Sequence, residues 1–448
     1  MAEIFPFRGV SFDPAKAGPF DELVTQPYDK ISTSDRERYL ARSPYSIARL
    51  ICSAPSGADL RRHFAGVADL YNRWLDDGVL VRSDKPCIYP YHQTYRVPGT
   101  GEQRTRRGFV GLGRLHDYAD GVVRPHEKTH SGPKADRLEL TRATGSQFGQ
   151  LFMLYHDPQG EVNGVLEQAT GSAEPVIEVT EGDGTVHRMW RIDNPEATAE
   201  VQRLMAGRSL YIADGHHRYE TALAYCREMA ANGVPVTGNE AIDRAMMSFV
   251  SAHDPGLSVL PTHRVLFGLE GFSVAGLLEK LAADFEISDA GEPNAKNLLA
   301  ALDNISGGRK FLLAARGHGT LVRLALKSSS NPDKLIPGAG SGQWKGLDVN
   351  LLHKLIFEHR LGISAEDLEH QRNVAYLRDP AEALEMVTAP DGKYQAVFFL
   401  NPTGVDEVVA VADNGEFMPQ KSTDFYPKML TGMVINKINL DQRRFRQE

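Results

Sequence analysis

Five consecutive residues, Asp214-Gly-His-His-Arg218, bring together a carboxylate, two imidazoles and a guanidinium. At the start of a helix, free backbone N–H groups and the positive end of the helix dipole attract an anion. Cationic and imidazole side chains at that place suit a phosphate group, so we predict that Gly215, His216, His217 and Arg218 bind phosphate or a nucleotide. The carboxylate of Asp214 could bind a metal ion that accompanies the phosphate, and Mg²⁺ is the ion expected for this chemistry.

The flanking residues predict the elements that would hold this turn. Leu210 to Ala213 form a short apolar run typical of a buried strand, and Gly215 allows a sharp turn and a close backbone approach to a ligand. Arg218 is expected to face solvent. The residues that follow have the i, i+3, i+4, i+7 spacing of a helix with one buried face, namely Tyr219, Ala222, Leu223, Cys226 and Met229.

A second interpretation of the turn is that Asp214 only caps the helix and that the two histidines lie on the surface. Capping explains one acidic residue. It leaves two imidazoles and a guanidinium in the same turn, where cations oppose the helix dipole unless an anion is present. The phosphate interpretation is therefore favoured.

The segment from Arg124 to His130 is a second group of ionisable side chains. Its mixture of acid, base and cation suits a catalytic loop, with Glu127 as the general base that takes a proton from a substrate hydroxyl and with His126 and His217 as further catalytic residues. A solvated charged loop is the plainer alternative. Zinc binding by His126 and His130 would require a helix, which the neighbouring prolines disfavour.

The segment from Met418 to Lys428 carries Lys421, Ser422, Thr423 and Lys428. Its content resembles that of a loop that contacts phosphate, although it has no Walker spacing. Lysines there would neutralise phosphate charge during phosphoryl transfer. We predict that these residues and Arg137 join the site, and that both loops converge on the Asp214–Arg218 turn.

The Asp214–Arg218 motif resembles the signature of the ParB/sulfiredoxin superfamily, which includes chromosome-partitioning CTP switches, sulfiredoxins and free-serine kinases. The whole chain more specifically resembles the uncharacterised family called domain of unknown function ten-fifteen. Three segments carry that closer resemblance, namely Gln26-Pro-Tyr-Asp-Lys-Ile31, Pro125-His-Glu-Lys-Thr129 with Asp136-Arg137, and Met418 to Lys428. The superfamily resemblance implies a fold in which the turn after a strand holds nucleotide phosphates.

Alternating strands and helices predict an α/β fold with a mixed (α+β) sheet, a ParB/sulfiredoxin-like core with insertions, and a smaller C-terminal α/β lobe. The predicted domains are residues 1–265, which bind phosphate, and 266–448, whose loop 418–428 returns to the site. The main predicted elements are a helix at 59–77, strands at 45–50 and 245–252, an extension of the latter by 257–264, hairpins at 87–95/108–115 and 310–314/321–326, a helix at 405–413 and strands at 396–400 and 432–435.

Composition excludes several classes of protein. The net charge is −8 and no Lys/Arg-rich run stands out, which argues against a general surface for binding nucleic acid. The cysteines Cys52, Cys87 and Cys226 are far apart, as expected for buried thiols in a reducing cytoplasm. Sulfiredoxin chemistry would want a cysteine in the phosphate turn, which has histidines instead. No apolar run reaches about 18 residues, so no membrane span is expected.

We therefore expect a cytoplasmic nucleotide-dependent phosphotransferase that uses ATP or ADP with Mg²⁺ and acts on a small hydroxylated metabolite. The resemblance to free-serine kinases suggests serine as the acceptor. A hydrolase of phosphate esters or nucleotides is a second hypothesis. A nucleotide-dependent binding switch of the ParB type is a third, disfavoured by the acidic charge and the lack of a basic recognition helix. Assembly into a homodimer is left open.

Overall fold

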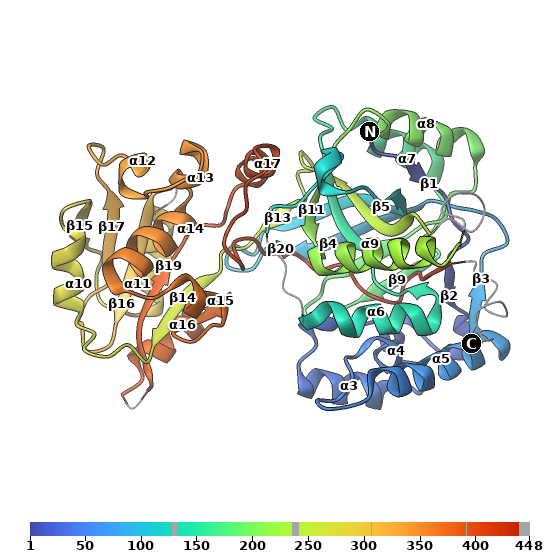
Figure 1. Ribbon diagram of the computed structural model, residues 1–448, viewed down its shortest axis with the longest axis horizontal. Coiled ribbons are helices and arrows are strands. Elements are labelled where there is room, and N and C mark those ends of the chain that lie inside the picture. The colour runs from blue at the N-terminus through green and yellow to red at the C-terminus, as the bar shows by residue number, and fades with distance from the viewer. Residues whose placement is uncertain (128–131, 235–241, 306, 391, 439–448) are drawn as a thin grey trace. The chain divides into compact units, whose positions relative to one another are not determined.

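The computed structural model describes residues 1–127, 132–234, 242–305, 307–390 and 392–438. The chain divides into two compact units (Figure 1). The first unit comprises Met1–Pro125, Thr129–Ser258 and Pro427–Glu448, and the second comprises His126–Lys128 and Val259–Tyr426. The chain thus leaves the first unit and returns to it near the C-terminus. The division into domains at residue 265 stays a prediction.

A nine-stranded sheet forms the centre of the first unit, in the order β6-β11-β8-β12-β5-β4-β10-β9, with β1 beside β5. Strand β11 is antiparallel to β8 and parallel to β6, whereas β12 is parallel to β8. The strands are β1 Ile4–Phe5, β4 Tyr89–Arg96, β5 Gln103–Arg114, β6 Val123–Arg124, β8 Leu151–Tyr155, β9 Ile177–Thr180, β10 Val186–Met189, β11 Leu210–Asp214 and β12 Arg244–Ser251. The predicted mixed α/β sheet and the hairpin of β4 and β5 are confirmed.

Helices cover the sheet, and α9, α6 and α5 run side by side in the first unit (Figure 1). Helix α5 begins after the cap residue Asp59 and buries the face that carries Phe64, Tyr71 and Trp74, as its apolar spacing predicts. The longer helices are α3 Thr33–Arg42, α5 Leu60–Asp76, α6 Gly132–Thr144, α7 Glu161–Thr170, α8 Pro195–Met205 and α9 His216–Ala231. The short elements are β2 Val10–Phe12, β3 Leu80–Arg82, β7 Ser146–Gln147, β21 Asn436–Lys437, α1 Pro14–Ala17, α2 Phe20–Leu23, α4 Ala48–Ile51, and the 3-10 turns η1 Tyr28–Lys30 and η2 Tyr118–Asp120.

The second unit contains a six-stranded sheet in the order β15-β17-β16-β19-β14-β18. The predicted hairpin of β16 and β17 and the helix at 405–413 are confirmed. The strands are β14 His263–Phe267, β15 Phe285–Asp289, β16 Lys310–Ala315, β17 Val322–Leu326, β18 Val374–Leu377 and β19 Tyr394–Phe399, and β13 Ser258–Val259 pairs with β20 Phe425–Tyr426. The helices are α10 Val274–Leu281, α11 Ala295–Asn304, α12 Pro332–Leu335, α13 Gly342–Gly346, α14 Asp348–Asn350, the π-helix η3 Leu351–Leu361, α15 Ala365–Glu369, α16 Pro380–Thr388 and α17 Val405–Asp413.

Three predicted strands are wrong. Residues 45–50 lead into helix α4, because Ile47, Ala48, Leu50 and Ile51 are all buried and do not alternate as a strand would. Residues 257–264 do not extend β12, since the backbone turns at Asp254, whose carboxylate accepts the Gly256 N–H at 2.9 Å. Residues 432–435 form only an isolated bridge between Ile435 and Val10, ahead of β21.

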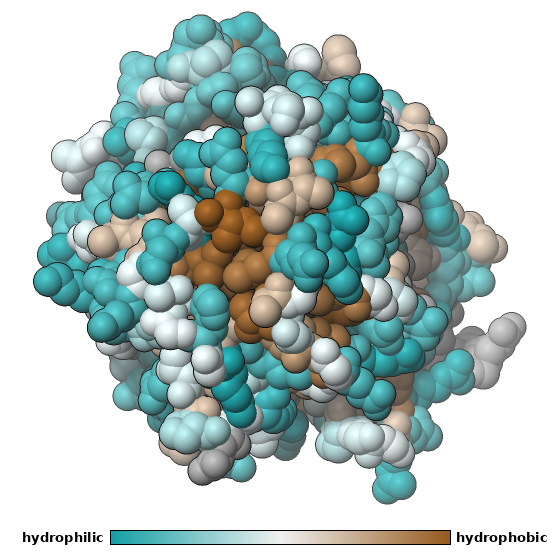
Figure 2. Space-filling view, turned by 90° about the vertical axis from the view of Figure 1, so that its left-hand side faces the viewer, coloured by the Kyte–Doolittle hydropathy of each residue, from teal (hydrophilic) through white to brown (hydrophobic). Residues whose placement is uncertain are grey.

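Figure 2 shows a group of hydrophobic side chains on one face of the molecule, surrounded by hydrophilic ones. Exposed large hydrophobic side chains among the described residues include Val81, Val176, Ile287 and Leu299. Single exposed apolar side chains such as these four are ordinary on folded proteins. Within the described part of the chain, no helix combines the length and apolar character needed to cross a membrane.

Candidate functional site

The Asp214–Arg218 motif lies at the turn between β11 and α9, as predicted. Gly215 is the N-terminal cap residue of α9, with φ of 97° and ψ of 27°, a left-handed conformation that favours glycine. No side chain caps the helix, so the alternative role of Asp214 as a helix cap is wrong. The 16-residue helix therefore begins with backbone N–H groups that its capping residue does not satisfy.

The carboxylate of Asp214 is surrounded by cations. Its Oδ2 accepts a hydrogen bond from Arg218 Nη2 at 2.7 Å, and its Oδ1 lies 3.5 Å from Lys428 Nζ. Burial alone would raise the pKa of this carboxyl group, but Lys428, Arg218, Lys30 and His216 outweigh burial and hold the pKa well below its usual range. The carboxylate is therefore charged at neutral pH, with three lysine and arginine charges acting on it.

Arg218 does not face bulk solvent, contrary to the prediction. Its side chain is only 15% exposed, and its Nη1 also donates to the carbonyl oxygen of Gln150. The guanidinium thus ties the start of α9 to the segment before β8. The physical reason is the turn at Gly215, after which the first turn of α9 brings Arg218 back to Asp214, the last residue of β11.

Lys428 reaches Asp214 because the sheet holds the backbone on either side of it. Gln93 Nε2 donates to the carbonyl oxygen of Lys428 at 2.9 Å, and the Tyr91 hydroxyl accepts from the N–H of Leu430 at 3.3 Å. Arg106, which is buried 4.7 Å from the Phe152 ring, donates to the carbonyl oxygen of Pro427. Buried polar groups of β4 and β5 therefore position the lysine.

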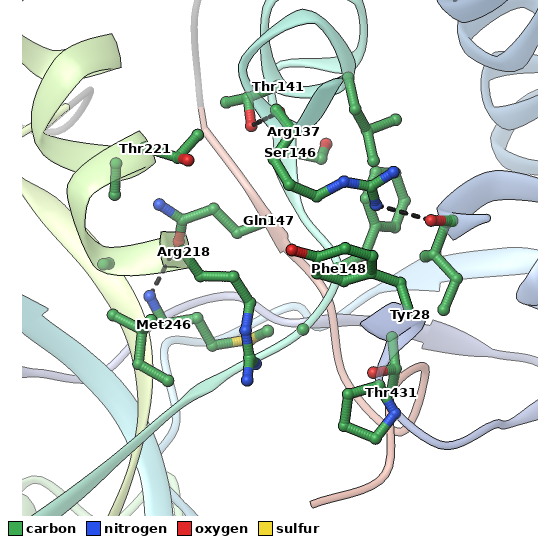
Figure 3. Close-up of a pocket in the computed structure, with 17 residues that line it drawn as sticks. Tyr28, Arg137, Thr141, Ser146, Gln147, Phe148, Arg218, Thr221, Met246 and Thr431 are labelled. Atoms are coloured by element: carbon green, nitrogen blue, oxygen red, sulfur yellow. Dashed lines mark hydrogen bonds between the residues drawn. The ribbon is translucent and has the colours of Figure 1, made fainter. Parts of the chain in front are cut away.

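A pocket of about 80 Å³ opens beside this turn (Figure 3). It lies among η1, α6, β7 and α9 and belongs wholly to the first unit. Figure 3 shows Tyr28 and Arg137 on one side of the pocket and Arg218, Thr221 and Met246 on the other. Arg218 both lines the pocket and binds Asp214.

Arg137, a predicted phosphate ligand, forms part of the pocket wall. Its guanidinium lies 4.1 Å from the centre of the Tyr28 ring, donates to the carbonyl oxygen of Ile51 at 2.6 Å and pairs with Asp136. Burial raises the pKa of the Tyr28 hydroxyl, and Asp29 adds to the rise. The guanidinium of Arg137 thus contacts other residues of the pocket wall. Its binding of phosphate stays a prediction.

His126, Glu127 and Thr423 form a separate group in the second unit. His126 Nε2 lies 2.9 Å from Thr423 Oγ1, and the same hydroxyl donates to Glu127 Oε1 at 3.4 Å. The carbonyl oxygen of His126 accepts the N–H of Met418 at 2.8 Å. The segments around residues 126 and 420, far apart in sequence, are therefore side by side. The other members of the predicted loop, Lys128 and His130, lie outside the described residues.

Lys421 and Ser422 precede Thr423 in the same unit. Lys421 is exposed with φ of 58°, and its carbonyl oxygen accepts from Arg264 Nη2 at 3.1 Å. The Ser422 hydroxyl donates to the carbonyl oxygen of Pro419. Of the predicted residues, Asp214, Gly215, His216, His217, Arg218, Arg137 and Lys428 belong to the first unit, and His126, Glu127, Lys421, Ser422 and Thr423 to the second. Convergence of the two groups stays a prediction.

The described residues offer few side chains that could coordinate a metal ion. Among the residues that the structure describes, no group of three or more His, Cys, Asp or Glu side chains could hold a metal ion. Asp214 is a single carboxylate with cationic partners. It fits Mg²⁺ only in the common mode in which one carboxylate and the substrate phosphates share the ion.

Sequence reasoning missed several residues at the turn. Lys30, which helps to lower the pKa of Asp214, belongs to the Gln26–Ile31 segment that carries part of the family resemblance. That segment was the signal that could have placed it. Gln93 and Arg106 lie in strands and gave no local signal, because their role depends on contacts with residues 427 and 428.

The solved structures that resemble this chain are distant from it. A conserved hypothetical protein from Pyrococcus furiosus is 16% identical with a TM-score of 0.31, over 68% of this chain and 87% of its own. A free serine kinase in complex with AMP is 14% identical with a TM-score of 0.33, over 70% and 89%. SbnI with a C-terminal truncation, from Staphylococcus aureus, is 12% identical with a TM-score of 0.35, over 75% and 94%.

A search of curated proteins finds no match. The model of the family described as "Protein of unknown function (DUF1015)" matches residues 4–350, which include the segments around residues 26 and 125 but not the segment 418–428, and the chain belongs to that family.

Proposed function

We propose that this protein is a nucleotide-dependent phosphotransferase whose first unit binds the phosphate groups at the turn between β11 and α9. The observation that carries the proposal is the charge around Asp214. Lys428, Arg218 and Lys30 act on one carboxylate at the beginning of a long helix. Positive charge gathered beside a helix N-terminus is the setting in which proteins bind phosphate groups, and this supports the proposal.

Phosphoryl transfer depends mainly on positioning and on positive charge around the transferred group. Arg218 offers a planar guanidinium and Lys428 a compact ammonium, the two kinds of cation that bind phosphate oxygens. His216 and His217 occupy the first turn of α9. The free backbone N–H groups of a first turn can bind an anion. Mg²⁺, when bound with the nucleotide, would neutralise phosphate charge, and Asp214 is the carboxylate that would hold it.

The general base proposed from the sequence is Glu127, with His126 beside it. The hydrogen bond from Thr423 to Glu127 supports this role, since it orients the carboxylate and leaves it able to accept a further proton. A small hydroxylated metabolite is the proposed acceptor, with serine as the first to test because of the resemblance of the Asp214–Arg218 motif to free-serine kinases.

The test is product analysis with labelled ATP and ADP, Mg²⁺ and a panel of hydroxylated metabolites. A phosphorylated acceptor that forms in step with nucleotide consumption is the expected result. Release of inorganic phosphate without an acceptor would instead identify a hydrolase. Binding without turnover would identify a nucleotide switch, and a nucleotide present at about 100 times its Kd should still add roughly 2.7 kcal/mol to stability.

A further inference from the structure

We propose that the pocket between η1, α6 and α9 receives the heterocyclic base of the nucleotide. This inference rests on the proposed function, since it assumes that phosphate binds at the Asp214–Arg218 turn. Arg218 provides the link, because its guanidinium lines the pocket and also donates to Asp214. A nucleotide with its phosphates at the turn would therefore have the pocket next to it.

The pocket is lined by apolar side chains and by an aromatic ring stacked with a guanidinium group. Tyr28 and the guanidinium of Arg137 lie 4.1 Å apart as parts of one wall. Flat heterocycles bind well against aromatic rings and guanidinium planes. The apolar side chains that line the rest of the pocket are Ile51, Leu140, Phe148, Leu151, Ala222, Ala245 and Met246. Such a lining favours a ring over a small polar metabolite.

The charges of the lining select against an amino acid. Of the described residues that line the pocket, Arg137 and Arg218 are charged, and none is an aspartate or glutamate. An ammonium group placed there would lose its hydration without gaining a carboxylate partner, which is costly. A neutral base carries no such charge. The pocket therefore suits the base, and an amino-acid acceptor such as serine must bind elsewhere.

Two hydroxyl groups are available to orient the base. Among the described residues, neither the hydroxyl of Tyr28 nor that of Thr431 has a hydrogen-bond partner, and both residues line the pocket. A hydroxyl both donates and accepts, so each can serve a ring nitrogen or an exocyclic group. The other polar groups are already used. Thr221, for example, donates to the carbonyl oxygen of His217 at 2.8 Å.

The experiment compares nucleoside diphosphates with inorganic pyrophosphate by titration calorimetry. Ala222→Leu fills the pocket from α9, and Ala224→Leu makes the same change at an exposed position of the same helix. We expect Ala222→Leu to weaken binding of ADP, or of whichever of GDP, CDP and UDP binds most tightly, at least tenfold. Pyrophosphate binding should stay within about twofold of wild type. Ala224→Leu should change neither.

A second variant keeps the proposal testable if Ala222→Leu does not fold. Tyr28→Phe keeps the stacked ring and removes only the hydroxyl, so it should weaken nucleoside diphosphate binding about two- to tenfold and leave pyrophosphate binding unchanged. Melting curves of each variant verify the fold.

The outcomes separate the two proposals. If well-folded Ala222→Leu and Tyr28→Phe bind the nucleotide as wild type does, or lose nucleotide and pyrophosphate equally, the base does not occupy the pocket, while phosphate binding at the turn stands. If wild type binds neither pyrophosphate nor any nucleotide, the proposed function itself fails.

Discussion

The ammonium nitrogen of Lys428 lies 3.5 Å from the Asp214 carboxylate, although residues 259–426 of the second unit separate the two in the sequence. The carboxylate belongs to the last residue of β11, which has a strand on each side, and the lysine belongs to the segment that returns from the second unit. The charge at the turn is therefore assembled by the tertiary fold and not by the Asp214–Arg218 motif alone.

Replacing Arg218 should damage both stability and binding. Arg218→Ala removes hydrogen bonds to Asp214 and to the Gln150 carbonyl in a mostly buried place, so we expect a loss of about 1–3 kcal/mol in the free energy of unfolding. Pyrophosphate affinity should fall as well. The control is Arg227→Ala on the same helix, whose exposed pair with Asp117 should cost at most about 1 kcal/mol. Urea unfolding and calorimetry measure the two effects, and equal losses in both variants would contradict the prediction.

Asp214 should make stability depend on pH at the acidic end. Its pKa in the folded protein lies below the value of about 3.9 expected in the unfolded chain, so the charged group adds stability above that value. The contribution is lost as the pH falls through the folded pKa. Wild type should therefore be more stable than Asp214→Asn near neutrality, and the difference should shrink below about pH 4.

Thermal unfolding between pH 2 and 7 tests this prediction. Asp69→Asn, at an exposed position on α5, controls for the loss of one carboxylate. A stability difference between wild type and Asp214→Asn that is constant over this range would refute it.

Gly215 should not tolerate a side chain. With φ of 97°, an alanine there is strained by about 1–2 kcal/mol, and its Cβ would lie 3.0 Å from Cζ of Arg218. Gly215→Ala should therefore lower Tm and weaken pyrophosphate binding. Gly233, with φ of 80° and nothing within 4 Å of an added Cβ, supplies a control with similar strain and no clash. Gly233→Ala should lower Tm and leave binding intact, and the same behaviour in Gly215→Ala would argue against the role of the turn.

Glu127→Gln tests the proposed base. The amide keeps the shape of the side chain and its contact with Thr423 but cannot take a proton, so kcat should fall about 100- to 10,000-fold while nucleotide affinity stays near that of wild type. Thr423→Val, which removes only the neighbouring hydroxyl, should have a smaller effect. Normal turnover by Glu127→Gln would make the residue structural. The carboxylate of Asp136, in helix α6, pairs with Arg137.

Sequence patterns predicted correctly those elements that depend on residues close together in the chain. The apolar strand, the glycine and the helical spacing place the β11–α9 turn, and the capped amphipathic pattern places α5. The content of residues 418–428 pointed to lysines near phosphate, but which lysine meets Asp214 depends on Gln93 and the paired strands. No sequence pattern carries that information.

The wrong predictions also arose from contacts between residues far apart in the sequence. The segment at 45–50 has the composition of a strand, yet it is buried on consecutive residues, and the N–H of Ile47 bonds to the carbonyl oxygen of Leu23 at 2.8 Å. Arg218 was expected to face solvent. The helix that begins after the left-handed Gly215 instead brings the Arg218 side chain to Asp214 and to the carbonyl oxygen of Gln150.

The first unit is built from separated segments of the sequence, and this determines the order in which the two units can be completed during synthesis. A ribosome delivers the chain from the N-terminus, and domains generally fold as their residues emerge. Residues 259–426 are complete before Pro427 is made, so the second unit can fold while the first still lacks its last segment. Only then can Lys428 reach Asp214 and β21 pair with β7. A fragment that stopped at residue 350, where the family match ends, would contain the motif but would never acquire the lysine that completes its charge.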